Sequence, residues 1–184
     1  MAHDYDIVVI GGGPAGYAGA IRAAQLGKKV LCVEKDKLGG ICLNWGCIPT
    51  KALLTNAHLV ELVRDHGAGF GFQGTAKWDF ARMISRSREV AGRLNKGIEG
   101  LFRKYKVESR QATAQVLAPG QVKIGDAVIT AGAILVATGA RPRSLPGAEF
   151  DGQRIISSKE AMSLPTQPKA LLVLGAGPIG LEFA

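Results

Sequence analysis

The sequence predicts an α/β protein with a doubly wound parallel sheet, and three observations lead to that prediction. The apolar, β-branched run over residues 6–10 passes directly into a glycine-rich turn and then into a helical stretch. A second apolar run, over residues 29–33, is followed at once by an acidic residue. The strand-and-glycine pattern of the N-terminus returns near residue 170. Apolar runs that alternate with helices are typical of strands buried inside parallel sheets.

The composition agrees with a globular protein of one domain or slightly more, since the 184 residues are 47% hydrophobic and 21% charged. No apolar run approaches the ~20 residues that a membrane span requires. The acidic N-terminus, residues 1–6, lacks the basic and apolar regions of a signal peptide. We therefore expect a cytoplasmic protein with no membrane partner.

The net charge of +8 raises the question of a nucleic-acid partner. The basic residues between positions 82 and 106 share their segment with apolar residues at helical spacing, which is typical of the solvated face of an amphipathic helix. No RNA- or DNA-binding motif accompanies them, so we expect no nucleic-acid partner. His58 and His66 have no partner at ligand spacing, and we expect no metal site. Much of the charge lies in Arg82, Arg86, Arg88, Arg93, Lys96, Arg103, Lys104 and Lys106.

The first glycine-rich turn has the spacing GxGxxG and leads into a helix expected over residues 17–26. Gly11 permits the tight turn, Gly13 lets the backbone approach a pyrophosphate, and Gly16 lets the helix pack closely on the strand. The helix N-terminus then offers N–H groups and a positive dipole to the phosphates. Glu34 follows about twenty residues later, where it would accept hydrogen bonds from a ribose. The pattern predicts a dinucleotide site but does not distinguish FAD from NAD.

Two cysteines, Cys42 and Cys47, lie five positions apart in a segment rich in Gly, Asn and Pro. On a regular helix this spacing advances about 7.5 Å, whereas the Cα atoms of a disulfide lie roughly 4.4–6.8 Å apart. A bridge therefore needs a distorted turn, which Gly46 allows and Pro49 encourages. The alternative is a pair of buried thiols, the interpretation that suits Cys32 in its apolar strand. We interpret the pair as a working redox dithiol, because strain makes a disulfide easier to reduce.

Between the two glycine turns, the elements follow from periodicity and turn signals. Apolar residues predict a helix over residues 51–64, and a loop follows over residues 67–74. Asp79 is the expected N-cap of a long helix that ends near Tyr105. The next five strands, separated in part by Pro and Gly turns, predict a small antiparallel meander inserted into the doubly wound unit. They cover residues 107–111, 112–117, 121–124, 127–130 and 133–136.

The C-terminal part is expected to be a proline-rich connector over residues 141–168, with one short helix near residues 158–163. An apolar strand is predicted over residues 170–174. Because the chain stops at Ala184, one turn into the next helix, we expect a fragment that ends inside a second dinucleotide-binding unit. Its GxGxxG turn consists of Gly175, Gly177 and Gly180.

Two dinucleotide motifs with a C-x4-C between them resemble the flavin-dependent pyridine nucleotide–disulfide oxidoreductases, and within that family the dihydrolipoamide dehydrogenases. The segment from Cys42 to Leu54 is nearly their signature, although Ile41 replaces a common Thr and Trp45 a common Val. The resemblance covers all 184 residues but only the N-terminal part of a family member.

The resemblance implies two domains. Residues 1–145 would be the N-terminal part of a Rossmann-like FAD-binding domain with the inserted meander. Residues 146–184 would be a connector and the truncated start of an NAD-binding domain, with its first strand and turn.

Roles for the site residues also follow from the resemblance. Cys47 would lie against the flavin, and Cys42 would be the outer sulfur that exchanges with the substrate. Ala114 would contact the adenine side, with Ala112 an equally close match. The residues expected to bind FAD are Gly11, Gly13, Gly16, Glu34, Gly40, Cys42, Lys51, Ala114, Thr138 and Gly139, with Glu182 paired to Lys51. The residues expected to bind NAD are Gly175, Gly177 and Gly180.

The implied activity is oxidation of dihydrolipoamide, with electrons passing through the Cys42–Cys47 disulfide and FAD to NAD⁺, in a 2-oxo acid dehydrogenase complex. The implied partners are a lipoyl domain and a second copy of the full-length chain. A His–Glu base would come from the C-terminal domain of that copy, so the fragment alone should be inactive and hold FAD weakly. Two alternatives stay open: a related reductase of glutathione, mercury or coenzyme-A disulfide, and a non-catalytic flavin-binding or assembly module.

Overall fold

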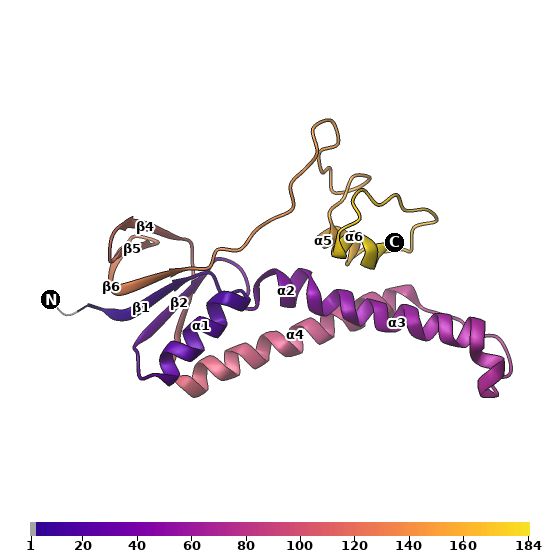
Figure 1. Ribbon diagram of the computed structural model, residues 1–184, viewed down its shortest axis with the longest axis horizontal. Helices are drawn as coiled ribbons and strands as arrows, with labels where there is room; N and C mark the ends of the chain where they lie inside the picture. The colour runs from indigo at the N-terminus through magenta and orange to yellow at the C-terminus, as the bar shows by residue number, and fades with distance from the viewer. Residues whose placement is uncertain (1–2) are drawn as a thin grey trace. The chain divides into compact units, whose positions relative to one another are not determined.

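The computed structural model describes residues 3–184, so Met1 and Ala2, the start of the acidic N-terminus, lie outside the described residues. The chain divides into two units, and Figure 1 labels their helices and strands. The first unit consists of the residues up to Asn44 together with Gly92–Arg141. The second unit consists of Trp45–Ala91 together with Pro142–Ala184.

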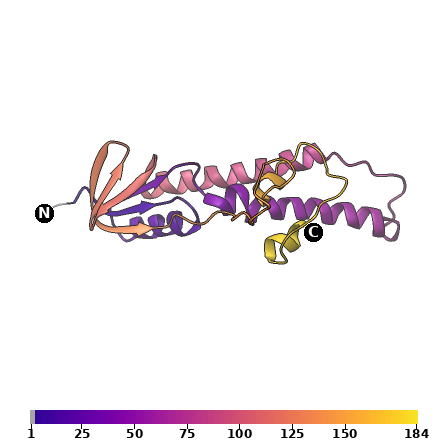
Figure 2. The same cartoon turned by 90° about the horizontal axis from the view of Figure 1, so that it is seen from above.

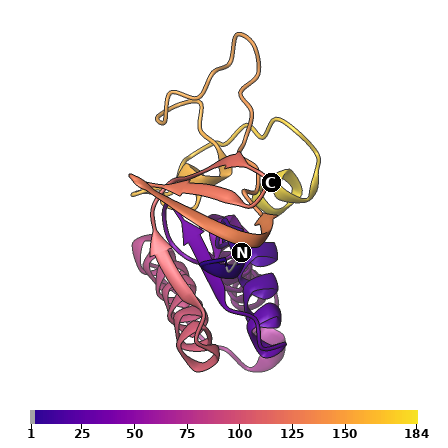
Figure 3. The same cartoon turned by 90° about the vertical axis from the view of Figure 1, so that its left-hand side faces the viewer.

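One six-stranded sheet organises the first unit, with the order β3-β2-β1-β6-β5-β4. β1 pairs in parallel with β2 and with β6, and β2 pairs in parallel with β3. β4, β5 and β6 form antiparallel pairs, which lie at the orange end of the sheet in Figure 3. The predicted α/β class is confirmed. The strands are β1 (Tyr5–Ile10), β2 (Val30–Glu34), β3 (Glu108–Gln111), β4 (Ala114–Ala118), β5 (Gln121–Ile124) and β6 (Ala127–Val136).

The sheet corrects two details of the predicted meander. β3 does not belong to it, because Glu108 pairs in parallel with Leu31 of β2 and so extends the parallel part of the sheet. β6 is one strand where two were predicted, over residues 127–130 and 133–136. Its first half pairs with β5 and its second half with β1, so hydrogen bonds to two neighbours carry the strand through Gly132.

The core of the first unit lies where the parallel strands meet the antiparallel hairpin. β1 and β2 are central strands, and their apolar side chains are almost completely removed from water. Burial of such side chains is the main stabilising contribution to a domain of this kind. The cluster consists of Tyr5, Val8, Ile10, Leu31, Val33, Val122, Ile124 and Ala131.

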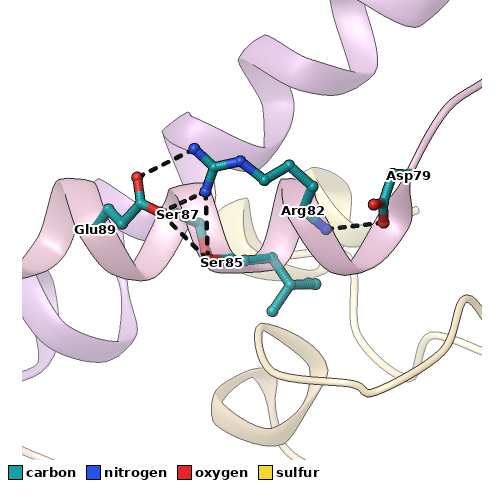
Figure 4. A network of polar contacts seen from close by, with 6 residues as sticks. Asp79, Arg82, Ser85, Ser87 and Glu89 are labelled. Atoms are coloured by element: carbon teal, nitrogen blue, oxygen red, sulfur yellow. Dashed lines mark hydrogen bonds and ion pairs between the residues drawn. The ribbon is translucent and has the colours of Figure 1, made fainter.

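The helices α2 (Gly40–Trp45) and α3 (Cys47–His66) carry the segment over residues 39–51, here called the redox segment after its predicted role. Asp79 caps the long helix α4, because its Oδ1 accepts from the backbone N of Arg82 at 3.0 Å, as predicted (Figure 4). The loop predicted over residues 67–74 begins instead with a turn of 3₁₀ helix. In the second unit, α3 and the start of α4 lie side by side (Figure 2). The helices are α1 (Pro14–Gln25), α2 (Gly40–Trp45), α3 (Cys47–His66), the 3₁₀ helix η1 (Gly67–Phe70), α4 (Phe80–Tyr105), α5 (Ser158–Ala161) and α6 (Pro178–Phe183).

The strand predicted over residues 170–174 does not form. A strand is defined by its hydrogen bonds to a neighbour, and no strand of the described chain pairs with this segment. Its side chains are correspondingly open to water, with Leu172 83% and Leu174 67% exposed. The glycine turn that was predicted to follow the strand is nevertheless present and leads into α6.

None of the helices among residues 3–184 combines the length and the apolar character needed to cross a membrane. Within the same residues, no three His, Cys, Asp or Glu side chains gather in a way that could hold a metal ion.

Candidate active site

The first glycine turn joins β1 to α1, and two of its glycines lie so close to neighbouring backbone that no side chain fits there. A Cβ on Gly16 would lie 1.7 Å from the carbonyl oxygen of Gly11, and one on Gly11 would lie 2.2 Å from the oxygen of Ala137. Gly13 differs, because its Cβ would meet nothing closer than the Cα of Gly40, at 3.7 Å. Gly13 is the N-cap of α1, and the packing of the chain leaves room for a larger residue at this position.

Glu34 stands at the end of β2 beside this turn. Its Oε2 accepts from the backbone N of Gly12 at 2.7 Å, and its Oε1 accepts from the backbone N of Asp36 at 2.9 Å. Two backbone donors therefore fix the carboxylate at the carboxyl end of the sheet, where ligands bind in doubly wound folds.

The redox segment begins against the same turn. The backbone N of Gly39 donates to the carbonyl oxygen of Gly12 at 2.7 Å. Gly40 has a φ of +56°, and a Cβ there would lie 2.6 Å from the Cα of Gly13. Only a residue without a side chain permits this approach of two backbones. Because Cys42 follows two residues later, its sulfur is carried on a helix that starts at the first glycine turn.

Two asparagines hold the start of α2 in place. The Nδ2 of Asn44 donates to the carbonyl oxygens of Leu38 and Gly40, at 3.0 and 2.9 Å. The Nδ2 of Asn95, on α4, donates to the Oδ1 of Asn44 at 2.8 Å and also to the oxygen of Leu38. No sequence pattern predicts a role for either residue. Asn95 lies among the basic residues of an amphipathic helix, where no local pattern distinguishes it from a solvated polar side chain.

Cys42 and Cys47 are disulfide-bonded, whereas Cys32 is a buried thiol. Gly46 lies between α2 and α3 with φ −152° and ψ −118°, so the helix is broken between the two cysteines. The distortion that the five-residue spacing demanded is therefore present at the predicted glycine. Cys42 is half-buried and Cys47 is exposed.

In the second unit, the residues that follow Gly46 contact the C-terminal segment. Lys51 forms an ion pair with Glu182. The buried hydroxyl of Thr50 donates to the carbonyl oxygen of Gly46 at 2.7 Å and lies 3.6 Å from the sulfur of Met162. The start of α3 is thus held by two side chains of the segment over residues 157–184, those of Met162 and Glu182.

The second glycine turn repeats the first. A Cβ on Gly180 would lie 1.9 Å from the carbonyl oxygen of Gly175, which corresponds to the contact between Gly16 and Gly11. Gly177 caps α6 with φ −75° and ψ 175°, close to the −74° and −173° of Gly13. The same backbone geometry recurs although the preceding strand is absent.

The remaining predicted residues fall into two groups. Thr138 follows β6 beside the first turn, since its Cα would lie 3.2 Å from a Cβ on Gly11, and Gly139 comes next with a φ of +69°. Ala114 lies instead in the β4–β5 hairpin, where it pairs with Ile124 and lines a shallow open pocket. The backbone N of the alternative, Ala112, donates to the carbonyl oxygen of Glu34 at 2.9 Å.

Comparison with known proteins agrees with this arrangement. Residues 5–184 match the family described as pyridine nucleotide-disulphide oxidoreductase. The chain is 43% identical to a dihydrolipoyl dehydrogenase of Rhizobium etli over the whole chain and 42% of that protein. It is 45% identical to the dihydrolipoyl dehydrogenase of Zymomonas mobilis over the whole chain and 41% of that protein. A leghemoglobin reductase of Vigna unguiculata is 44% identical over 97% of the chain and 35% of its own length. The chain thus spans about two-fifths of the curated relatives it matches.

The three cysteines should differ in reactivity. Burial, with a smaller effect from Glu34, raises the pKa of Cys32 to about 12. At pH 8 only about one molecule in ten thousand would carry that thiolate, the form that reacts. Iodoacetamide should therefore label no cysteine in the native oxidised protein, two after dithiothreitol treatment, and three after reduction in denaturant. Mass spectrometry counts the labels, and rapid labelling of Cys32 in the native protein would contradict this assignment.

Proposed function

Because the chain belongs to the pyridine nucleotide-disulphide oxidoreductase family, we propose that the whole protein oxidises dihydrolipoamide to lipoamide through a Cys42–Cys47 disulfide, with FAD and NAD⁺ as cofactors. The main observation behind this proposal is the disulfide between Cys42 and Cys47. It spans a break in the helix, and that helix begins against the first glycine turn. The names of several relatives support the choice of substrate within the family.

The residues around the first turn fit an FAD pyrophosphate and ribose. A Cβ on Gly13 would enter space that no other part of the turn fills, beside the N-terminus of a twelve-residue helix. Backbone N–H groups and the helix dipole make such a position favourable for phosphate. Glu34 would accept from the ribose hydroxyls, and Gly40, Thr138 and Gly139 would line the path of the cofactor. Ala114 would contact its adenine side.

The disulfide performs the first half of the reaction by thiol–disulfide exchange. One thiolate of dihydrolipoamide attacks the sulfur of Cys42, the Cys42–Cys47 bond breaks, and Cys47 leaves as a thiolate. The second substrate sulfur then attacks the mixed disulfide, which closes the lipoamide ring and releases Cys42. Two electrons have moved from the substrate to the protein, and the substrate protons pass to Cys42 and to a base.

When bound, FAD supplies the step that accepts the two electrons and delivers a hydride to NAD⁺. Lys51 would place its positive charge beside the flavin, held there by its ion pair with Glu182. Gly175, Gly177 and Gly180 would hold the NAD pyrophosphate in the turn that repeats the first one. Cys47 would lie against the flavin, which requires it to be a thiolate after reduction.

The wider setting belongs to the same proposal. The whole protein would serve a 2-oxo acid dehydrogenase complex in the cytoplasm, act as a homodimer and accept a lipoyl domain. Residues 1–145 would form the first part of the FAD domain, and residues 146–184 the connector and the start of the NAD domain. Because the base and most of the cofactor enclosure would lie outside this chain, residues 1–184 alone should not reduce NAD⁺.

Serine substitutions in the whole protein test the proposed function. Cys42→Ser and Cys47→Ser should each lower the rate of dihydrolipoamide-dependent NAD⁺ reduction by on the order of a thousandfold or more, because each removes one of two sulfurs that act as a unit. Cys32→Ser is the matched control and should retain most of the activity. Full activity in either redox variant, or faster turnover of glutathione, mercuric ion or coenzyme-A disulfide than of dihydrolipoamide, would contradict the proposal.

The two glycines of the first turn separate folding from cofactor binding. Gly16→Ala should lower the free energy of unfolding by more than about 3 kcal/mol, since the new Cβ overlaps a carbonyl oxygen. Gly13→Ala should change it by about 1 kcal/mol or less, at a helix N-cap, yet weaken FAD binding at least tenfold. Urea unfolding and flavin fluorescence measure the two effects. A Gly13→Ala protein that binds FAD normally would contradict the placement of the pyrophosphate.

A further inference from the structure

Trp45 lies three residues after Cys42 and two before Cys47, at a position where the resemblance leads one to expect valine. Within the second unit its ring is flanked by two cations. The guanidinium carbon of Arg88 lies 4.9 Å from the ring centroid, and the Nζ of Lys159 also lies 4.9 Å from it. These distances fall within the range of cation–π attraction, which is strongest for tryptophan.

The two cations reach the ring from segments that are distant in sequence. Arg88 projects from α4, and Lys159 from the short helix α5. α5 is itself anchored, because Ser157 and Glu160 form a capping box at its start, and Met162 is buried against Thr50. The position of Lys159 over the ring is therefore fixed by the fold of the second unit.

The acidic residues that follow the two cations in sequence make contacts of their own. Glu89 follows Arg88 in sequence and binds Arg82 on the same helix (Figure 4). Glu160 follows Lys159 and accepts from the backbone N of Ser157 at 2.9 Å. A third acid of this unit, Glu182, binds Lys51. The contacts of the ring itself are with two positively charged side chains, Arg88 and Lys159.

Reduction of the disulfide creates negative charge in this segment. At neutral pH the two-electron step converts one S–S bond into a thiol and a thiolate, and nearby cations stabilise the thiolate relative to the thiol. We propose that Trp45 is a tuning residue, which holds Arg88 and Lys159 beside the redox segment and thereby makes the Cys42–Cys47 disulfide easier to reduce. This inference rests on the proposed function, because it takes that disulfide to be the working redox pair.

Equilibrium with dithiothreitol measures the effect without any substrate. Dithiothreitol gives up two electrons and two protons and closes its own disulfide, while the Cys42–Cys47 bond breaks. Cys42 takes one proton, Cys47 remains a thiolate, and the second proton enters the buffer. The whole protein is held in buffers of reduced and oxidised dithiothreitol, its thiols are blocked, and trypsin releases the peptide over residues 38–51, which contains both cysteines.

Substitutions at the ring and at one cation give the expected shifts. At pH 8, Lys159→Gln should lower the equilibrium constant for reduction about threefold, as for a partly exposed charge, and Trp45→Val should lower it by about threefold or more because both cations lose their support. Trp45→Phe keeps an aromatic face and should stay close to wild type. The differences should become smaller as the pH is lowered towards 5, because protonation of the thiolate removes the charge that the cations stabilise.

Lys104→Gln is the matched control. The Nζ of Lys104 also lies over an aromatic ring, 5.3 Å from the centroid of Tyr105, but neither residue belongs to the redox segment. This variant should leave the equilibrium unchanged at both pH values. Equal constants for all variants at pH 8, a shift of equal size at pH 5, or the same shift in the control would each overturn the inference. The readout is the state of the peptide and not the rate of turnover. The test of this inference therefore does not depend on whether dihydrolipoamide is the substrate.

Discussion

The site depends on one contact between backbones, the approach of Gly40 to Gly13. A side chain at Gly40 would collide with the Cα of Gly13, and the adjacent bond from Gly39 to the oxygen of Gly12 holds the two segments together. This contact places the start of the redox helix at the end of β1, where a doubly wound sheet presents its ligand. The proposed chemistry at the sulfurs and the proposed binding at the turn are thereby joined by this one backbone contact.

The second constraint acts after Gly46, where the helix is broken. Three residues near this break, one before Gly46 and two after it, contact the C-terminal segment of the second unit, each by a different interaction. The three interactions are a cation–π contact, a buried hydroxyl–sulfur contact and an ion pair. The pairs are Trp45 with Lys159, Thr50 with Met162, and Lys51 with Glu182.

The parts of this arrangement that sequence could predict are those with local causes. Periodicity located the central strands, the spacing of glycines located both turns, and Asp79 marked the start of α4. The errors have non-local causes. β6 continues through Gly132 because two strands pair with it, the segment over residues 170–174 lacks a strand partner, and the role of Asn95 exists only because α4 passes the start of α2. No pattern within the sequence encodes such encounters.

In the proposed reaction the sulfurs of Cys42 and Cys47 carry the electrons, and this can be tested by trapping the two thiols during the reaction. The whole protein is mixed with dihydrolipoamide without NAD⁺, its thiols are blocked at once, and the tryptic peptide over residues 38–51 is weighed. We expect a peptide with both cysteines labelled, and a return to the disulfide when NAD⁺ is added before blocking. A peptide that keeps its disulfide under conditions in which the protein reduces NAD⁺ would contradict it.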